Sequence, residues 1–155
     1  RDVWNSFGGF DIKLSHNEDY AYAQKLKNAG IHFFFAPKAI VNWQPRQNLT
    51  DAAKMFFRFA YGDIEAGILR PKVKFLALRY LLALFLFFFF WEINRSISLN
   101  YLGLSFSLYS LWAVVKNYRY VNALLAAFWL PVLQYTADFS VLVGTLTAYL
   151  SKMYR

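Results

Sequence analysis

Charged residues almost disappear from the second half of this chain, and no other feature of the sequence constrains its fold as strongly. Residues 75–150 contain only six Asp, Glu, Lys or Arg side chains, whereas residues 1–74 carry most of the charge. The chain has 155 residues, of which 58% are hydrophobic and 21% aromatic, and a soluble domain of this length is less apolar. We therefore expect a polar region and a membrane region that meet near Pro71.

Three stretches of the apolar half are long enough to enter a bilayer. Residues 75–91 would rise about 25 Å as a helix, slightly short of a ~30 Å hydrocarbon core, and residues 97–115 form a second span. The basic, aromatic residues 116–119 should then face the cytoplasm. Residues 121–150 exceed one span, so a tilted span, a broken helix and a helix lying partly on the preceding domain all fit. Asp138 at mid-bilayer would cost roughly 2.5 to 3.5 kcal/mol, so we expect it to face protein, water or the interface.

The overall charge and the cysteine content limit the function classes. The net charge is +8, but the basic residues are scattered and many flank the apolar spans. Such residues more often mark the cytoplasmic side of a membrane than a nucleic-acid surface, so the expected partner is membrane lipid and not nucleic acid. The chain has no cysteine, which excludes a disulfide, a thiolate metal site and a cysteine nucleophile.

The polar half reads as alternating elements. Residues 1–18 are rich in turn-forming residues, and a helix begins near Asp19 and stops at Gly30, which is placed to be the residue after its C-cap. The aromatic run 31–36 is bounded by glycine and proline and predicts a buried strand. Residues 39–43 alternate more weakly and predict a second strand.

A second helix follows, within residues 49–70, with Asn48 or Thr50 as its N-cap. Its apolar residues recur at helical spacing and form an amphipathic stripe. The stripe consists of Ala52, Met55, Phe56, Phe59 and Ala60. Two interpretations stay open, because such a helix can lie in the headgroup layer or pack against the preceding domain.

The order of motifs in the first 70 residues resembles membrane-bound family 2 glycosyltransferases. The chain reads Gly-Gly-Phe-Asp at residues 8–11, Glu-Asp at residues 18–19, then a helix, Gly30 and an aromatic run. The acceptor half of these enzymes carries the same succession. The resemblance implies an α/β fragment, the acceptor half of a GT-A-like domain, over residues 1–48. An amphipathic interfacial helix over 49–70 and a transmembrane helical region over 71–155 would follow it.

The resemblance also assigns roles to single residues. The aspartate of the Glu-Asp pair is the general base of an inverting transfer, and by position this is Asp19; on the residues alone, a helix cap is the alternative. Arg58 matches the arginine that meets the donor diphosphate in a Gln-x-x-Arg-Trp motif. Met55 and Phe59 replace the Gln and Trp of that motif, which does not favour processive polymer synthesis. The substrate-binding residues are then Gly8, Gly9, Phe10, Asp11, Glu18, Trp43, Arg46 and Arg58.

The ligands implied are a nucleotide-sugar donor and a sugar or lipid-linked acceptor. The resemblance further implies Mg²⁺ or Mn²⁺ in the complete enzyme, although this chain carries no metal motif such as Asp-x-Asp. We therefore expect the C-terminal portion of a multi-pass cell-membrane glycosyltransferase with a cytoplasmic catalytic segment, incomplete for catalysis by itself. The alternative is a non-enzymatic membrane scaffold or a fragment of a transporter.

Overall fold

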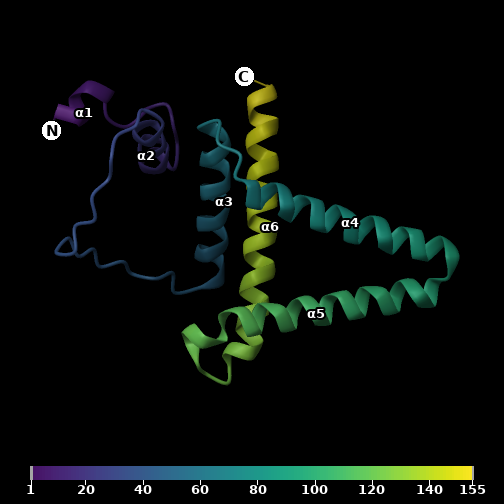
Figure 1. The fold of residues 1–155 in the computed structure, drawn as a ribbon. Coiled ribbons are helices and arrows are strands. Elements are labelled where there is room, and N and C mark those ends of the chain that lie inside the picture. Colours follow the sequence, from purple (N-terminus) through teal and green to yellow (C-terminus); the bar gives the residue numbers. More distant parts are fainter. Residues whose placement is uncertain (1, 155) are drawn as a thin grey trace. The chain divides into compact units, whose positions relative to one another are not determined.

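The fold is all-α over the part of the chain that the computed structural model describes, residues 2–154, which contains no strand. Six helices follow one another along the chain (Figure 1). They are α1 (Asp2–Phe7), α2 (Glu18–Asn28), α3 (Leu49–Glu65), α4 (Pro71–Ile93), α5 (Arg95–Val121) and α6 (Ala126–Met153). The predicted α/β fragment, the acceptor half of a GT-A-like domain, is therefore wrong as a description of this structure.

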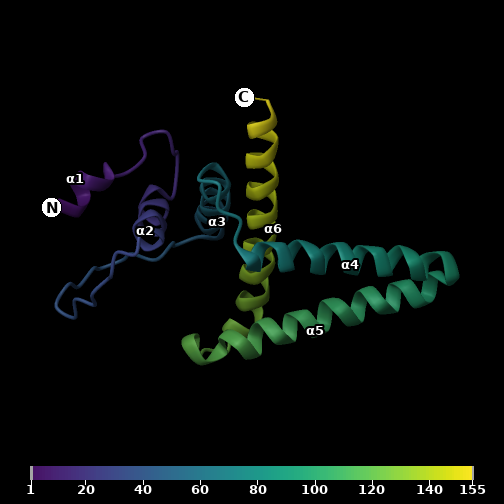
Figure 2. The ribbon, with the colours of Figure 1, turned by 45° about the horizontal axis from the view of Figure 1, so that its top comes forward.

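The two predicted strands, 31–36 and 39–43, belong to a long loop between α2 and α3 (Figure 2). Phe34 and Phe35 are 92% and 89% exposed, so the aromatic run is not a buried strand. A strand exists only where a second strand accepts and donates its backbone hydrogen bonds. Residues 2–154 supply no such partner, which explains why a strand-like sequence stays a loop.

Local helix signals agree better with the structure. At the end of α2 the N–H of Gly30 donates to Lys27 O at 3.1 Å and that of Ile31 donates to Leu26 O at 3.1 Å. Gly30 has a φ of 75°, so this end is a Schellman motif, as its position predicted. Asn48 caps α3 by accepting the Asp51 N–H at 2.8 Å. The helix α1 was not predicted, because a turn-rich composition hides a helix this short.

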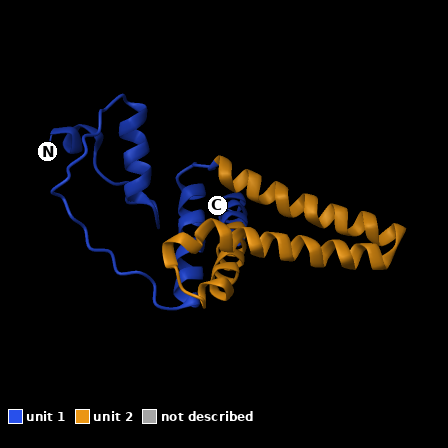
Figure 3. Ribbon diagram, turned by 60° about the horizontal axis from the view of Figure 1, so that its bottom comes forward, with its two compact units in different colours: residues 1–70, 143–155 blue, residues 71–142 orange. Residues whose placement is uncertain are grey.

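The chain divides into two compact units, coloured separately in Figure 3. Unit 1 contains residues 1–70 and 143–155, and unit 2 contains residues 71–142. The helix α6 contributes its last turns to unit 1 and its first turns to unit 2.

Within unit 1, α3 runs beside the C-terminal part of α6 (Figure 1). The two helices approach closely at Gly144, where an added Cβ would lie 2.5 Å from the carbonyl oxygen of Phe57. Lys152 Nζ donates to the carbonyl oxygen of Ile64 at 2.6 Å. The helix α3 thus packs on protein along this side, with Ala60 among its buried residues.

Within unit 2, α4 and α5 form an antiparallel hairpin turning at Asn94 (Figure 1). The side chain of Asn94 accepts the N–H of Ser96 at 2.8 Å and caps α5. Inside the hairpin Ser98 Oγ donates to Phe87 O at 2.9 Å. The hydroxyl of Ser98 therefore has a hydrogen-bond acceptor although it lies between two apolar helices.

The helices α4, α5 and α6 are each long and apolar enough to cross a membrane, which indicates a multi-pass membrane protein. No residue of α4 is buried within the chain, so its apolar surface needs lipid around it. The helix α6 runs unbroken through Pro131. Three courses were open for residues 121–150; the structure shows one continuous helix from Ala126, preceded by a break at residues 122–125, where Asn122 adopts a left-handed conformation and ends α5.

Candidate functional site

A cleft in unit 1 brings together four of the residues predicted to form the site. We call it the α2–α3 cleft; it has a volume of about 460 Å³ and is lined from both helices and from the loops before them. Glu18 and Asp19 come from the first turn of α2, Arg58 from α3, and Arg46 from the loop that precedes α3. The sequence separates these residues by up to 40 positions, and the fold alone collects them.

Further charged residues line the α2–α3 cleft. Lys54 and Asp51 come from α3 and His16 from the loop before α2. Lys54 and Asp51 belong to no motif that predicts a site, although they lie one and two helical turns before Arg58 on the same helix. The cleft therefore holds cations and carboxylates side by side, which suits an anionic ligand that reacts next to a base.

Asp19 lies one residue inside α2 and is not its N-cap. Its Oδ1 accepts the backbone N–H of Tyr20 at 2.6 Å. The residue before the helix, Asn17, provides no side-chain cap. The N-terminus of a helix attracts negatively charged side chains, so the position suits an acidic residue.

Asn17 instead ties the start of α2 to α3. Its φ is 59°, and its Nδ2 donates to the carbonyl oxygen of Phe59 at 2.7 Å and to Asp63 Oδ1 at 3.0 Å. Asp63 is only 6% exposed. Arg70 donates to the same carboxylate from Nε and, at 2.9 Å, from Nη2. The guanidinium of Arg70 also lies 4.2 Å from the ring centre of Tyr20, and its hydrogen bond to Asp63 raises the pKa of Arg70.

Backbone contacts fasten the same loop to α3. An added Cβ at Gly62 would lie 2.6 Å from the carbonyl oxygen of His16, so the loop rests directly on the helix there. The backbone N–H and the hydroxyl of Ser15 both donate to Glu65 Oε2. Residues 15–17, which lead into the Glu-Asp pair, are thus held along one side of α3.

The predicted glycine turn lines a different cleft of unit 1, of about 620 Å³, which we call the glycine-turn cleft. Gly8 and Gly9 both have positive φ, 74° and 67°, and an added Cβ at Gly9 would lie 2.7 Å from the Trp4 ring. Phe10 packs edge-on against that ring at 4.9 Å. Asp11 uses Oδ1 to accept the Lys13 N–H at 2.9 Å, as in an Asx-type turn. The structure therefore divides the predicted site between two clefts.

Trp43 lines neither cleft and is 70% exposed in the loop before α3. Within residues 2–154, no three or more Asp, Glu or His side chains gather closely enough to hold a metal ion. The carboxylates of the α2–α3 cleft consequently do not fit a divalent cation by themselves.

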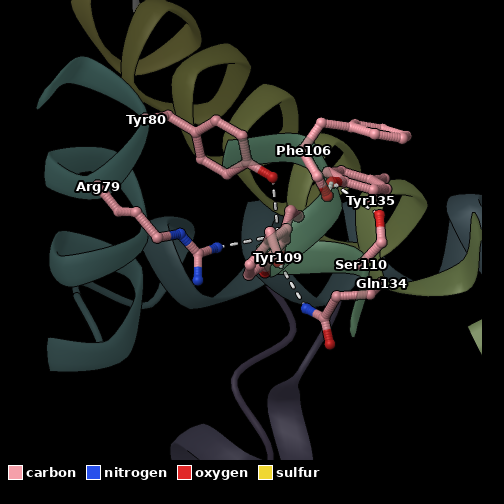
Figure 4. A network of polar contacts seen from close by, with 8 residues as sticks. Arg79, Tyr80, Phe106, Tyr109, Ser110, Gln134 and Tyr135 are labelled. Atoms are coloured by element: carbon pink, nitrogen blue, oxygen red, sulfur yellow. Dashed lines mark hydrogen bonds and ion pairs between the residues drawn. The ribbon is translucent and has the colours of Figure 1, made fainter. Parts of the chain in front are cut away.

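Unit 2 contains a buried polar cluster around Asp138 of α6, which is 6% exposed (Figure 4). Its Oδ2 accepts hydrogen bonds from Arg79 Nη2 at 3.0 Å, Tyr80 OH at 2.9 Å and Tyr109 OH at 2.6 Å. Its Oδ1 accepts from Gln134 Nε2 at 2.9 Å. Asp138 therefore faces protein, one of the environments expected for it, and three different helices supply the donors.

Comparison with known proteins identifies no relative: no family model, no curated protein and no solved structure matches the chain. The geometry of the clefts and the sequence motifs are the observations from which a function can be argued.

Proposed function

We propose that this chain is part of an inverting membrane glycosyltransferase. It moves a sugar from a nucleotide-sugar donor to the hydroxyl of an acceptor. The observation that carries the proposal is the α2–α3 cleft, in which Asp19 and Arg58 line one cavity with Arg46 and Lys54. The proposed transfer needs a carboxylate as base and positive charges beside it, and these residues supply both.

In the proposed step, the carboxylate of Asp19 accepts the proton of the acceptor hydroxyl. The hydroxyl oxygen attacks the anomeric carbon of the donor sugar, and the bond between that carbon and the diphosphate oxygen breaks. The electron pair leaves with the nucleoside diphosphate, and the configuration at the anomeric carbon inverts. The position of Asp19 in the first turn of α2, where it lines the cleft beside Arg58, supports this role.

The cations of the cleft would bind the diphosphate. Arg58 can offer two parallel N–H groups to phosphate oxygens, and Arg46 and Lys54 add positive charge beside it. Together they would neutralise charge that develops on the leaving group. A nucleotide-sugar is therefore the donor class that best fits this cleft.

A lipid-linked acceptor is supported by unit 2. An apolar groove of about 570 Å³ lies there, lined mainly by α4 and α5, a volume within the usual range for small-ligand sites. Arg79 is the charged residue among its lining, and Tyr80 and Tyr109 add hydroxyl groups. Because both helices are candidate membrane spans and the groove is lined mainly by apolar side chains, an apolar lipid chain is the ligand class that suits it.

A divalent cation is implied by the resemblance alone. The carboxylates described here form no group that could hold Mg²⁺ or Mn²⁺, so the proposed step uses only the side chains of the chain itself. The proposed location is the cell membrane, with the α2–α3 cleft on the cytoplasmic side, because Lys72, Lys74, Lys116 and Arg119 flank the α4–α5 hairpin.

The test compares Asp19→Asn with wild type in membranes that contain the complete protein. Transfer of radiolabelled sugar from a panel of nucleotide-sugars into the lipid extract is measured. Loss of a general base lowers the rate roughly 10²- to 10⁴-fold. Asp2→Asn is the matched control, because it removes a carboxylate from the first turn of α1, outside the cleft. Turnover of Asp19→Asn within a few-fold of wild type, at normal expression, would refute the proposed role.

A further inference from the structure

We propose that Asn17, Asp63 and Arg70 form a positioning relay that sets where the first turn of α2 presents Asp19 in the cleft. None of the three was singled out by the sequence. The proposal rests on the proposed function only for the role of Asp19. The contacts of the relay would fix the start of α2 whatever the role of Asp19.

The geometry of the relay is continuous. Arg70 holds the Asp63 carboxylate at both oxygens, and Asp63 Oδ1 in turn accepts from Asn17 Nδ2 at 3.0 Å. Asn17 directly precedes α2, and its backbone carbonyl accepts the first helical hydrogen bond, from the Ala21 N–H, at 2.9 Å. A displacement of Asn17 would therefore displace the turn that contains Glu18 and Asp19.

The conformation of Asn17 indicates that this contact is not incidental. Its φ of 59° lies in the left-handed region, which asparagine tolerates better than other residues with side chains. Its side chain does not cap α2, although asparagine is among the best N-cap residues. It reaches instead to Phe59 O and to Asp63, both on α3. Hydrogen bonds from Asn17 to α3, the helix that also carries Arg58, thus replace the capping hydrogen bond that Asn17 could make within α2.

Burial makes the relay rigid. Asp63 is 6% exposed, so little water can reach its carboxylate to replace a lost hydrogen-bond donor. Arg70 is held from a second direction by the ring of Tyr20, which belongs to α2. Arg70 also directly precedes Pro71, the first residue of α4. Arg70, the residue before the first candidate span, is therefore connected to Asn17 through Asp63 and to Tyr20 directly.

The relay makes a specific kinetic prediction. Asp63→Ala removes the acceptor for both Asn17 and Arg70, so Asp19 loses its fixed position while the cations of the cleft stay in place. Misplacing a reacting group by about 1 Å can cost on the order of 10²-fold in rate. We expect kcat to fall roughly 10- to 100-fold and the donor KM to change by less than about threefold. Asp63→Asn keeps an oxygen for Asn17 and should recover most of the activity.

A double-mutant cycle separates positioning from a general loss of structure. If Asp63 acts through Asp19, adding Asp63→Ala to Asp19→Asn should lower the remaining rate by less than about threefold. Full additivity of the two losses would overturn the relay. Glu92→Ala, an exposed carboxylate of α4, is the control and should leave the rate unchanged.

Hydrogen exchange supplies a readout that does not need activity. The relay predicts that amides in the first turn of α2 exchange at least about tenfold faster in Asp63→Ala, while those of α6 keep their wild-type rates. Unchanged protection at Ala21, whose N–H donates to the carbonyl oxygen of Asn17, would overturn it. If Asp63→Ala does not fold, Asn17→Ala tests the same link from its other end. Full activity of Asp19→Asn would refute the proposed function. Wild-type activity of Asp63→Ala, together with loss of activity in Asp19→Asn, would refute only the relay.

Discussion

The Asp138 cluster offers the sharpest test of how unit 2 is held together. Asp138→Ala removes the acceptor of four hydrogen bonds, donated by Arg79, Tyr80, Tyr109 and Gln134. These donors come from α4, α5 and α6, so the substitution breaks contacts among three helices at one point. It also leaves the guanidinium of Arg79 without its carboxylate.

Two estimates bracket the loss of stability. Hydrogen bonds between membrane helices contribute about 0.6 kcal/mol each on average, so the three that join α6 to α4 and α5 contribute roughly 1.8 kcal/mol together. Removing one partner of a fully buried ion pair costs about 3 to 5 kcal/mol, because the other charge is left uncompensated. The side chain of Arg79 is 42% exposed and can reorient its charge towards a polar environment. We therefore expect a value near the lower estimate, roughly 2 to 3 kcal/mol.

The assay is thermal unfolding of the purified chain in detergent, followed by circular dichroism. For a protein of this size, 1 kcal/mol shifts Tm by about 2 to 4 °C, so Asp138→Ala should lower Tm by roughly 4 to 12 °C. Phe139→Ala, at a neighbouring position that is 71% exposed, is the control and should change Tm little. Replacing Arg79 by Met in the same molecule should restore part of the loss, since the unpaired cation is then gone. A Tm of Asp138→Ala within 1 °C of wild type, or strict additivity with Arg79→Met, would refute this account.

Two other predictions concern helix packing and membrane topology. Gly144→Ala should destabilise unit 1 by about 1 to 3 kcal/mol in chemical unfolding, because its Cβ would lie 2.5 Å from a backbone oxygen of α3. Gly103→Ala has open space around its Cβ and should stabilise slightly, so equal effects would contradict the packing argument. For topology, the chain has no cysteine, so Ser96→Cys and Tyr120→Cys are unique thiol labels at the two ends of α5. A membrane-impermeant reagent on intact cells should label Ser96→Cys and spare Tyr120→Cys, and the reverse pattern would contradict a cytoplasmic cleft.

The sequence by itself determined the helices α2 to α5 and the separation of polar and apolar regions. The end of α2 at Gly30 and the start of α3 after Asn48 follow from local signals, because a helix makes its hydrogen bonds within a few residues of the same chain segment. The candidate spans follow from apolar length, which is likewise a local property. The Glu-Asp pair and Arg58 could be proposed for one site from their motifs, and they line one cleft.

The tertiary structure alone decided the rest. Residues 31–36 have a strand-like composition, but a strand depends on a distant partner, and none lies within the described chain. Motif order grouped Gly8 and Gly9 with Asp19, whereas the fold places them in separate clefts. The partners of Asp138 lie up to 59 positions away, and Asn17 reaches Asp63 across 46 positions. Hydropathy and spacing describe neighbours along the chain, so contacts at such separations are fixed only when the helices pack.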